Sequence, residues 1–334
     1  MLFFSLTACG GAKESPTIAP EARGASDGPA ATPADPGSVA APGATTPPGN
    51  PPGTTPPPTS GAADPIAGIG SVTPVETGFA YIEGPVWRAD DATLLFSDIP
   101  NDAIVKLDSM ANVFSTFRAP SGKSNGLAID AKGRLIACES AARRVTRTLP
   151  NGTREVLVDN FQGDALNAPN DLIVRNDGAI YFTDPDYSIA GTKELSFQGL
   201  YRIDTSGNLA LVADDMDKPN GIALSPDEGT LYVSDEAAGF LRAYDLAPSG
   251  AATNPRKIAE VPHADGFAVD DDGNLYVSSS NGIVVLKSDG TLRGTIPVPK
   301  QPANCTFGGP ARKTLFITAQ DTLYKIELNV AGKP

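Results

Sequence analysis

The sequence predicts an all-β protein, a six-bladed β-propeller built of four-stranded antiparallel blades. Two observations carry this prediction. A polar side chain recurs at intervals of 42, 45, 50, 45 and 39 residues, and periods of about 40 to 50 residues are typical of arrays whose units pack on their neighbours. Short alternating apolar runs separate Gly, Asp and Asn turns, without helical periodicity, which favours strands. The recurring positions, called the ring residues below, are Glu83, Asn125, Asn170, Asn220, Asp265 and Asn304.

Each repeat contains the same succession of expected strands. The first strand follows the ring residue, as at 126–130 and 221–225. An Asp/Gly turn leads to a second strand at 134–138, 180–183, 231–234, 275–278 and 315–318. The third strand is expected at 104–107, 199–203, 241–244, 283–286 and 323–327, and a fourth follows another Gly turn, as at 292–296. Because the first strand of a propeller blade lines the central channel, the six ring residues should meet at one mouth of that channel.

The two ends of the predicted ring complete each other. The last repeat, from Asn304 to Leu328, supplies only three strands. The segment from Ser71 to Thr77 is a spare strand before the first ring residue. We expect this N-terminal strand to complete the last blade, which closes the ring and removes an exposed sheet edge.

The N-terminal part has a different composition. Residues 1–8 form an apolar run before Cys9, and the Leu6–Cys9 sequence resembles a bacterial lipobox, whose cysteine is acylated. The run is too short to span a bilayer. From residue 10 to 68 the chain holds 14 of its 31 prolines and no aromatic residue, so it cannot build a core.

We therefore expect a lipoprotein-type signal segment at 1–8, a disordered linker at 9–68 and a propeller domain at 69–334. The implied location is the bacterial cell envelope, lipid-anchored or periplasmic, with the membrane contacted only through Cys9. The alternative is a chance occurrence of the lipobox pattern near the start of the chain.

Bulk composition excludes several function classes. A net charge of −13 disfavours nucleic-acid binding, which needs a basic surface. The single histidine, His263, excludes an HExxH zinc site, and the absence of a Gly-x-Ser-x-Gly motif argues against a serine hydrolase. Cys138 and Cys305 lie in different repeats, so we expect two separate buried thiols. We expect a monomer.

The chemistry of the ring residues indicates a cation site. Carboxylate and carboxamide oxygens are hard ligands that suit Ca²⁺ or Mg²⁺. Without a cation, buried Glu83 and Asp265 would repel each other and be costly to desolvate. The alternative is that each Asn-Gly or Asp-Gly pair only marks a turn. The register of all six positions, and the presence of Glu83 among them, favours the site.

Several motifs occur in an order that resembles a known family. The chain is similar to the SMP-30/gluconolactonase/luciferin-regenerating family, especially bacterial gluconolactonases, from about residue 75 to the C-terminus. The segments that carry this resemblance are 83–87 (EGPVW), 95–101 (LFSDIPN), 168–171 (APND), 181–187 (YFTDPDY), 218–221 (KPNG), 231–235 (LYVSD), 264–266 (ADG) and 302–310 (PANCTFGGP).

The resemblance implies a metal-dependent lactonase acting on a small-molecule sugar lactone or a related lactone. It implies one divalent cation in the channel, with Ca²⁺ preferred to Mg²⁺ or Zn²⁺. The implied ligands are Glu83, Asn220 and Asp265, and Asn170 would contact the substrate beside the metal. Some relatives carry an arginine where this chain has Ala168, so their sugar recognition is not carried over.

General chemistry adds roles to these positions. A bound dication polarises a lactone carbonyl and lowers the pKa of a water. Asp265 is the candidate general base, in addition to being a ligand. Asn125 and Asn170 would orient the substrate or stabilise the developing oxyanion, and Asn304 would be structural. The alternatives are a phosphotriesterase-like hydrolase and a non-enzymatic, surface-tethered propeller that binds a structural ion.

Three further residues are expected near the ring residues, at the rim or in loops. His263 lies two residues before Asp265, and a loop histidine at the blade rim is favoured over a proton shuttle. Asp184 and Tyr187 either form a rim over the pocket or belong to an ordinary surface loop.

Overall fold

The structure, a computed structural model, describes residues 64–333 except 188 and 190. Within these residues the chain forms strands β1 to β26 and no α-helix. Accordingly, the described part contains no helix long and apolar enough to cross a membrane. The expected signal segment at 1–8, and the expected linker at 9–68 as far as residue 63, lie outside the described residues.

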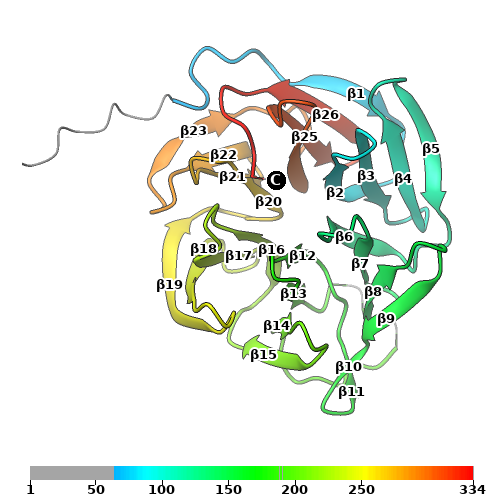
Figure 1. The fold of residues 1–334 in the computed structure, drawn as a ribbon. Coiled ribbons are helices and arrows are strands. Elements are labelled where there is room, and N and C mark those ends of the chain that lie inside the picture. Colours follow the sequence, from blue (N-terminus) through cyan, green and yellow to red (C-terminus); the bar gives the residue numbers. More distant parts are fainter. Residues whose placement is uncertain (1–63, 188, 190, 334) are drawn as a thin grey trace, which may run out of the picture. The chain divides into compact units, whose positions relative to one another are not determined.

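Six four-stranded antiparallel sheets surround one axis as blades, so the predicted six-bladed propeller is confirmed (Figure 1). Blade 1 consists of β2 (Ile82–Arg88), β3 (Thr93–Asp98), β4 (Ala103–Asp108) and β5 (Val113–Arg118). Blade 2 consists of β6 (Ser124–Ile129), β7 (Leu135–Glu139), β8 (Arg144–Thr148) and β9 (Arg154–Val158). Blade 3 consists of β12 (Leu172–Val174), β13 (Ile180–Asp184), β14 (Gly199–Ile203) and β15 (Leu209–Ala213).

The second half of the ring repeats this pattern. Blade 4 consists of β16 (Pro219–Leu224), β17 (Thr230–Asp235), β18 (Phe240–Leu246) and β19 (Ala252–Glu260). Blade 5 consists of β20 (Phe267–Val269), β21 (Leu275–Ser279), β22 (Gly282–Leu286) and β23 (Leu292–Ile296). Blade 6 takes β24 (Asn304–Gly308), β25 (Thr314–Ala319) and β26 (Thr322–Glu327) from the C-terminal end. A small hairpin of β10 (Asn160–Phe161) and β11 (Asp164–Ala165), which the sequence did not predict, joins blades 2 and 3.

The N-terminal strand closes the ring as predicted. Strand β1 (Thr73–Thr77) pairs antiparallel with β26, from Thr73 opposite Lys325 to Thr77 opposite Thr322. The hydroxyls of Thr77 and Thr322 are 2.9 Å apart, within hydrogen-bond distance. Blade 6 therefore contains both ends of the domain and binds them together.

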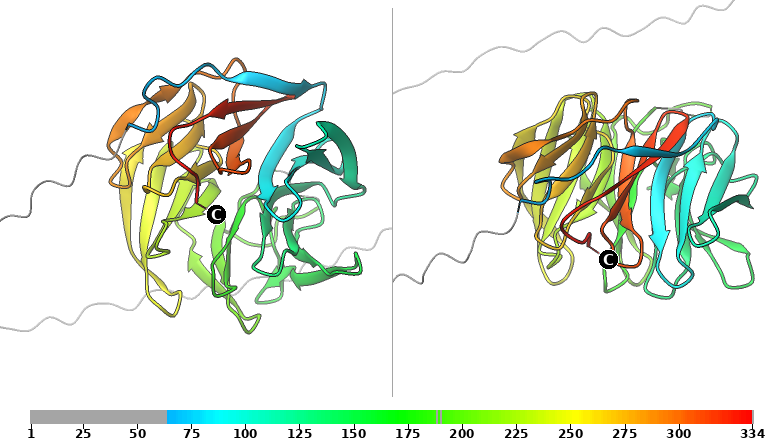
Figure 2. Two further views of the ribbon diagram at one scale, coloured as in Figure 1. Left: turned by 45° about the horizontal axis from the view of Figure 1, so that its top comes forward. Right: turned by 90° about the horizontal axis from the view of Figure 1, so that it is seen from above.

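The innermost strands form a continuous wall around the axis. Each of β2, β6, β12, β16, β20 and β24 contacts the innermost strand of the blade on either side. These strands run along the axis, so their first residues lie at one mouth of the channel and their last residues at the other (Figure 2). This arrangement places the ring residues together.

The core is divided among the junctions between blades. In the described residues six buried apolar clusters occur, and each joins two neighbouring blades. The cluster between blades 5 and 6, for example, contains Tyr276 from β21 and Ile317 from β25. Burying the two faces of neighbouring sheets against each other removes apolar surface from water and fixes the angle between blades.

The two cysteines in the described part follow the prediction. Cys138 lies in the apolar cluster between blades 2 and 3, and Cys305 lies in the cluster between blades 5 and 6. Both are buried free thiols.

Residues 64–68, at the end of the expected linker, contact the propeller. Ile66 packs against the cluster between blades 5 and 6, together with Ile69 and Val72. The side chain of Asn329 donates hydrogen bonds to the carbonyls of Asp64 and Ala67.

Candidate active site at the channel mouth

Each ring residue stands at, or just before, the start of an innermost strand. Glu83, Asn125 and Asn220 are the second residues of β2, β6 and β16, Asn304 opens β24, and Asn170 and Asp265 precede β12 and β20 by two residues. Five of the six are buried, and Asp265 stays partly exposed. The structure thus brings all six sequence-predicted positions to the same mouth of the channel.

Glycines let the strand starts approach one another closely. A Cβ on Gly266 would lie only 2.0 Å from the side chain of Asn304 in the next blade. A Cβ on Gly84 would lie 2.0 Å from the carbonyl oxygen of Asn125, and Gly84 also has a φ of +53°. The glycine after a ring residue is therefore required by close packing around the axis, beyond its role as a turn signal.

Hydroxyl groups of one blade donate hydrogen bonds to the backbone carbonyls of ring residues in the next blade. Thr183 in blade 3 donates to the carbonyl of Asn220 in blade 4 at 2.7 Å, and Ser234 in blade 4 donates to the carbonyl of Asp265 in blade 5 at 2.9 Å. Ser97 in blade 1 does the same for Asn125 in blade 2 at 2.8 Å. The serine or threonine near the end of a second strand thus fixes the next ring residue.

An aspartate that ends the second strand fixes the approach to the ring within its own blade. Asp98 accepts backbone hydrogen bonds from Ala80 and Tyr81, just before Glu83. Asp184 accepts one from Asn167, and Asp235 accepts two from residues 217 and 218. Asp184 is fully buried as the last residue of β13, so both expected placements, at the rim or in a surface loop, are wrong.

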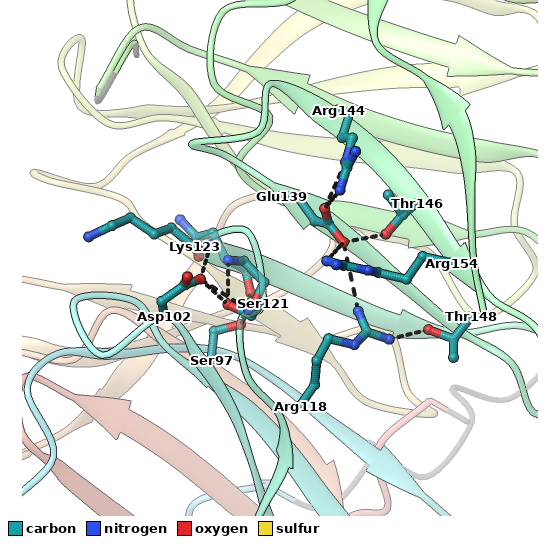
Figure 3. Close-up of polar contacts among 12 residues, drawn as sticks. Ser97, Asp102, Arg118, Ser121, Lys123, Glu139, Arg144, Thr146, Thr148 and Arg154 are labelled. Carbon is teal, nitrogen blue, oxygen red and sulfur yellow. Dashed lines mark hydrogen bonds and ion pairs between the residues drawn. The ribbon is translucent and has the colours of Figure 1, made fainter. Parts of the chain in front are cut away.

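In blade 2 different residues fix the chain that leads to the ring residue (Figure 3). Asp102 of blade 1 accepts hydrogen bonds from the backbone of Ser121 and Lys123, and the Ser121 hydroxyl accepts from the backbone of Ser124. These bonds fix the loop that leads to Asn125.

Glu139 takes the place of the aspartate at the end of the second strand in blade 2. Its fully buried carboxylate accepts from Arg144 at 2.8 Å, Arg154 at 3.1 Å and Thr146 at 2.9 Å (Figure 3). A Cβ on Gly122 would meet this carboxylate at 2.8 Å, so Glu139 packs directly under the loop to Asn125. The arginines compensate the cost of burying its charge.

Three carboxylates gather at the mouth, and in the part of the chain that the structure describes none of them forms an ion pair. Burial and the carboxylate of Asp171 raise the pKa of Glu83 to about 8. Burial raises the pKa of Asp171 to about 6. Although an edge of Asp265 is exposed, desolvation and the Glu83 and Asp171 carboxylates raise its pKa well above the usual range. Lys218, two residues before Asn220, pairs with Asp186 instead.

Asp171 was missed as a site residue from the sequence. It follows ring residue Asn170, where four of the six repeats have glycine. One carboxylate oxygen accepts from the backbone of Leu172 at 2.9 Å, and the other accepts from Asn304 Nδ2 at 3.3 Å across the channel. Asp171 could have been identified from the sequence because it is a charged residue at the position that glycine occupies in most repeats.

The donor set suits a hard cation. In the described residues no group of three or more His, Cys, Asp and Glu side chains is placed to hold a metal by itself. The mouth instead combines the carboxylates of Glu83 and Asp265 with carboxamide oxygens, among which Asn220 is the expected ligand. Burial and neighbouring carboxylates raise the pKa values of Glu83 and Asp265, and a bound dication would stabilise their ionised forms. The residues present therefore fit the expected group.

Other polar side chains surround the mouth. Tyr187 accepts a hydrogen bond from Asn220 Nδ2 at 3.1 Å, and its hydroxyl lies 3.4 Å from Glu236 Oε2. His263 Nδ1 lies 2.7 Å from Glu236 Oε1, and the His263 side chain is 62% exposed. Tyr187 and His263 thus lie at the rim, and Glu236 is a rim residue that sequence reasoning missed.

A cavity of about 410 Å³ occupies the channel from Asp171 and Asn304 to the loops at the far ends of the innermost strands, where Asp130 and Arg312 line it. Its walls are mostly apolar residues of the innermost strands, such as Val86, Ile222 and Phe307. Asp171 and Asn304 line it, whereas Glu83, Asn220 and Asp265 do not. A molecule at the mouth would therefore meet the ring residues before it reached this cavity.

Comparison with known proteins identifies the family. Residues 82–321 match the SMP-30/gluconolactonase/LRE-like region, and the chain belongs to this family. It is 35% identical to a gluconolactonase of Zymomonas mobilis, over 78% of this chain and 83% of that protein. It is 26% identical to a pentonolactonase of Haloferax volcanii, over 73% and 83% of the two chains.

Solved structures agree with the fold. A gluconolactonase from Xanthomonas campestris superposes with a TM-score of 0.74 at 36% identity, over 80% of this chain and 91% of that chain. A calcium-binding regucalcin from Agrobacterium tumefaciens superposes with a TM-score of 0.68 at 17% identity, over 79% and 95%, which supports the fold alone.

The hydroxyl of Thr183 should be essential for the stability of the ring. Thr183→Val keeps the shape of the side chain but leaves the buried carbonyl of Asn220 without this donor. We expect a loss of about 1–3 kcal/mol in the free energy of unfolding, measured by denaturant titration, whereas Thr183→Ser should lose less. A valine variant within about 0.5 kcal/mol of the serine variant would contradict this role.

Asp184 should make stability depend on pH. Burial raises its pKa from 3.8 to about 7, so the folded state binds this proton more tightly than the unfolded state. Its contribution to stability therefore falls as pH rises from about 4 through about 7.

Asp184→Asn removes this titration, and the oxygen that becomes an amide nitrogen has no hydrogen bond in the described structure. The free energy of unfolding of the variant minus that of wild type should rise by on the order of 2 kcal/mol from pH 5.5 to pH 8.5, measured by denaturant titration at both pH values. A difference in the free energy of unfolding that is the same at both pH values would show that Asp184 is not the titrating group.

Proposed function

We propose that this protein is a divalent-metal-dependent hydrolase that opens a sugar lactone or a related lactone. The observation that carries the proposal is the cluster of Glu83, Asp265 and ring carboxamides at the channel mouth. Membership of the SMP-30/gluconolactonase/LRE-like family supports it, since similar proteins bear the names gluconolactonase and pentonolactonase.

Glu83, Asn220 and Asp265 would hold the cation, with calcium the preferred ion. When bound, such a cation polarises a carbonyl and lowers the pKa of a water. Glu83 and Asp265 supply two negative charges, and Asn220 adds a neutral oxygen, so part of the coordination sphere stays free for water and substrate. Asp171 lies beneath these residues, and its charge adds to the negative potential of the mouth.

Asp265 is the proposed general base. Its carboxylate can accept a proton, and its partial exposure leaves it accessible to water. It takes one proton from the attacking water while the water oxygen bonds to the lactone carbonyl carbon. The ring C–O bond then breaks, and the ring oxygen receives that proton from Asp265. The product is a hydroxy acid.

Asn125 and Asn170 would bind the substrate. Both are buried at the mouth, so their carboxamides are held in place before the substrate arrives. Their N–H groups can donate to the carbonyl oxygen as negative charge develops on it, or to substrate hydroxyls. Fixed donors need no reorganisation during the reaction, which is why the hydroxyl bond from Ser97 to the Asn125 carbonyl matters for this role.

The full-length protein should acidify a weakly buffered gluconolactone solution, and EDTA should abolish this activity. Glu83→Gln and Asp265→Asn should each lower kcat/KM at least about 100-fold, because each removes a charge from the site. Glu76→Gln, at an exposed position on β1, is the matched control and should retain full activity.

A panel of aliphatic lactones and a phosphotriester should be assayed in parallel. Turnover of the phosphotriester alone would favour a phosphotriesterase, and no turnover of any substrate would favour a binding module with a structural ion. Lactone turnover that survives EDTA would overturn the metal dependence.

We also propose that the protein is anchored to the bacterial cell envelope through Cys9, which the lipobox-like sequence before Cys9 supports. In fractionated bacterial cells the full-length protein should accompany the membranes, and Cys9→Ala should release it because the acylated residue is lost. Equal membrane association of the two forms would contradict the anchor.

A further inference from the structure

Tyr187 connects the ring residues to the rim through its hydroxyl. It follows β13 by three residues and is 41% exposed at the mouth. Asn220 Nδ2 donates to its oxygen at 3.1 Å, and the hydroxyl lies 3.4 Å from Glu236 Oε2. Glu236 Oε1 is in turn 2.7 Å from His263 Nδ1. A continuous chain of hydrogen bonds therefore runs from the exposed histidine to Asn220.

The direction of these hydrogen bonds is determined by Glu236. A carboxylate can only accept, so the single hydroxyl proton of Tyr187 is donated to Glu236. The Tyr187 oxygen must then accept its other hydrogen bond. Asn220 can supply that bond only with its amide nitrogen, which turns its carboxamide oxygen away from Tyr187.

This direction matters because a carboxamide has two ends of similar size and opposite chemistry. The oxygen of Asn220 can bind a cation, whereas the nitrogen cannot. A rotation of 180° about the terminal torsion exchanges the two ends at small steric cost. Without a partner that distinguishes oxygen from nitrogen, the side chain would populate both orientations.

Asn304 shows the opposite arrangement in the same ring. Its Oδ1 accepts from the backbone of Cys305 at 2.8 Å, and its Nδ2 donates to Asp171. The oxygen of Asn304 is thus used within its own strand, which agrees with a structural role. The two asparagines have different hydrogen-bond partners, and only those of Asn220 leave its oxygen available.

The ring of Tyr187 is itself supported. Lys218 Nζ lies 4.9 Å from the centre of the tyrosine ring, in cation–π geometry. Lys218 also pairs with Asp186, which pairs with Lys193 at 2.7 Å. These contacts keep the hydroxyl beside Asn220 although the ring is partly exposed.

We propose that Tyr187 is a positioning residue that, together with Glu236, holds the carboxamide oxygen of Asn220 in the orientation that binds the cation. This inference rests on the proposed function, because it assumes that Asn220 is a metal ligand. Partners that orient a metal ligand through hydrogen bonds typically change metal affinity about 10- to 100-fold when they are removed.

The experiment is a calcium titration by isothermal calorimetry on full-length, EDTA-treated protein. Tyr187→Phe keeps the aromatic ring over Lys218 and removes only the hydroxyl, and it should weaken calcium binding about tenfold or more. Tyr324→Phe is the matched control, because it removes a tyrosine hydroxyl from β26, the third strand of blade 6, within the apolar cluster between blades 5 and 6. The control should bind calcium as wild type does.

A second background separates orientation from general damage. In Asn220→Asp the two side-chain oxygens are equivalent, so no partner is needed to choose between them. Adding Tyr187→Phe to Asn220→Asp should therefore change the calcium affinity less than about twofold. Equal losses in both backgrounds would overturn the inference, because they would indicate a collapsed mouth.

The outcomes also distinguish the inference from the proposed function. Tight calcium binding by both wild type and Tyr187→Phe would refute the role of Tyr187 and leave the metal site standing. A wild type that binds neither calcium nor, in parallel titrations, magnesium or zinc would refute both.

Discussion

The close approach of the six innermost strands to one axis is the constraint on which the rest of the structure depends. Backbone meets backbone there, so glycine stands next to most ring residues, and hydroxyls such as that of Thr183 bind the carbonyls of the following blade. The apolar clusters between blades hold the sheets at the angle that this contact requires. The positions of the ring residues therefore depend on the packing of all six blades.

The same close approach concentrates negative charge. Glu83, Asp171 and Asp265 are brought together by the convergence of three different blades. Burial raises the pKa of each, and the Asp171 carboxylate further raises the pKa values of Glu83 and Asp265. A buried carboxylate elsewhere in the molecule, Glu139, is compensated by arginines. In the described residues the mouth has no such ion pair, and this contrast supports the proposed cation.

The repeated features were predictable from the sequence, and the features that occur once were not. Six blades, the closing strand and the ring residues follow from a period and an alternation that recur along the chain. Asp171 escaped notice because its importance depends on Asn304, which is 133 residues away. Glu236 carries no local signal, and its contacts with Tyr187 and His263 exist only after blades 3, 4 and 5 have assembled. Asp184 was misplaced because its backbone partner, Asn167, precedes it by 17 residues.

The composition of blade 6 has a consequence for biosynthesis. Thr73 and its partner Lys325 are separated by 252 residues, so β1 leaves the ribosome among the first strands and finds its partner only when the last has been made. Until then the nascent domain is an open arc with an unpaired edge at each end. Chains that terminate early cannot close, which exposes them to aggregation or proteolysis. Only a chain that has been synthesised through β26 can therefore form the closed ring.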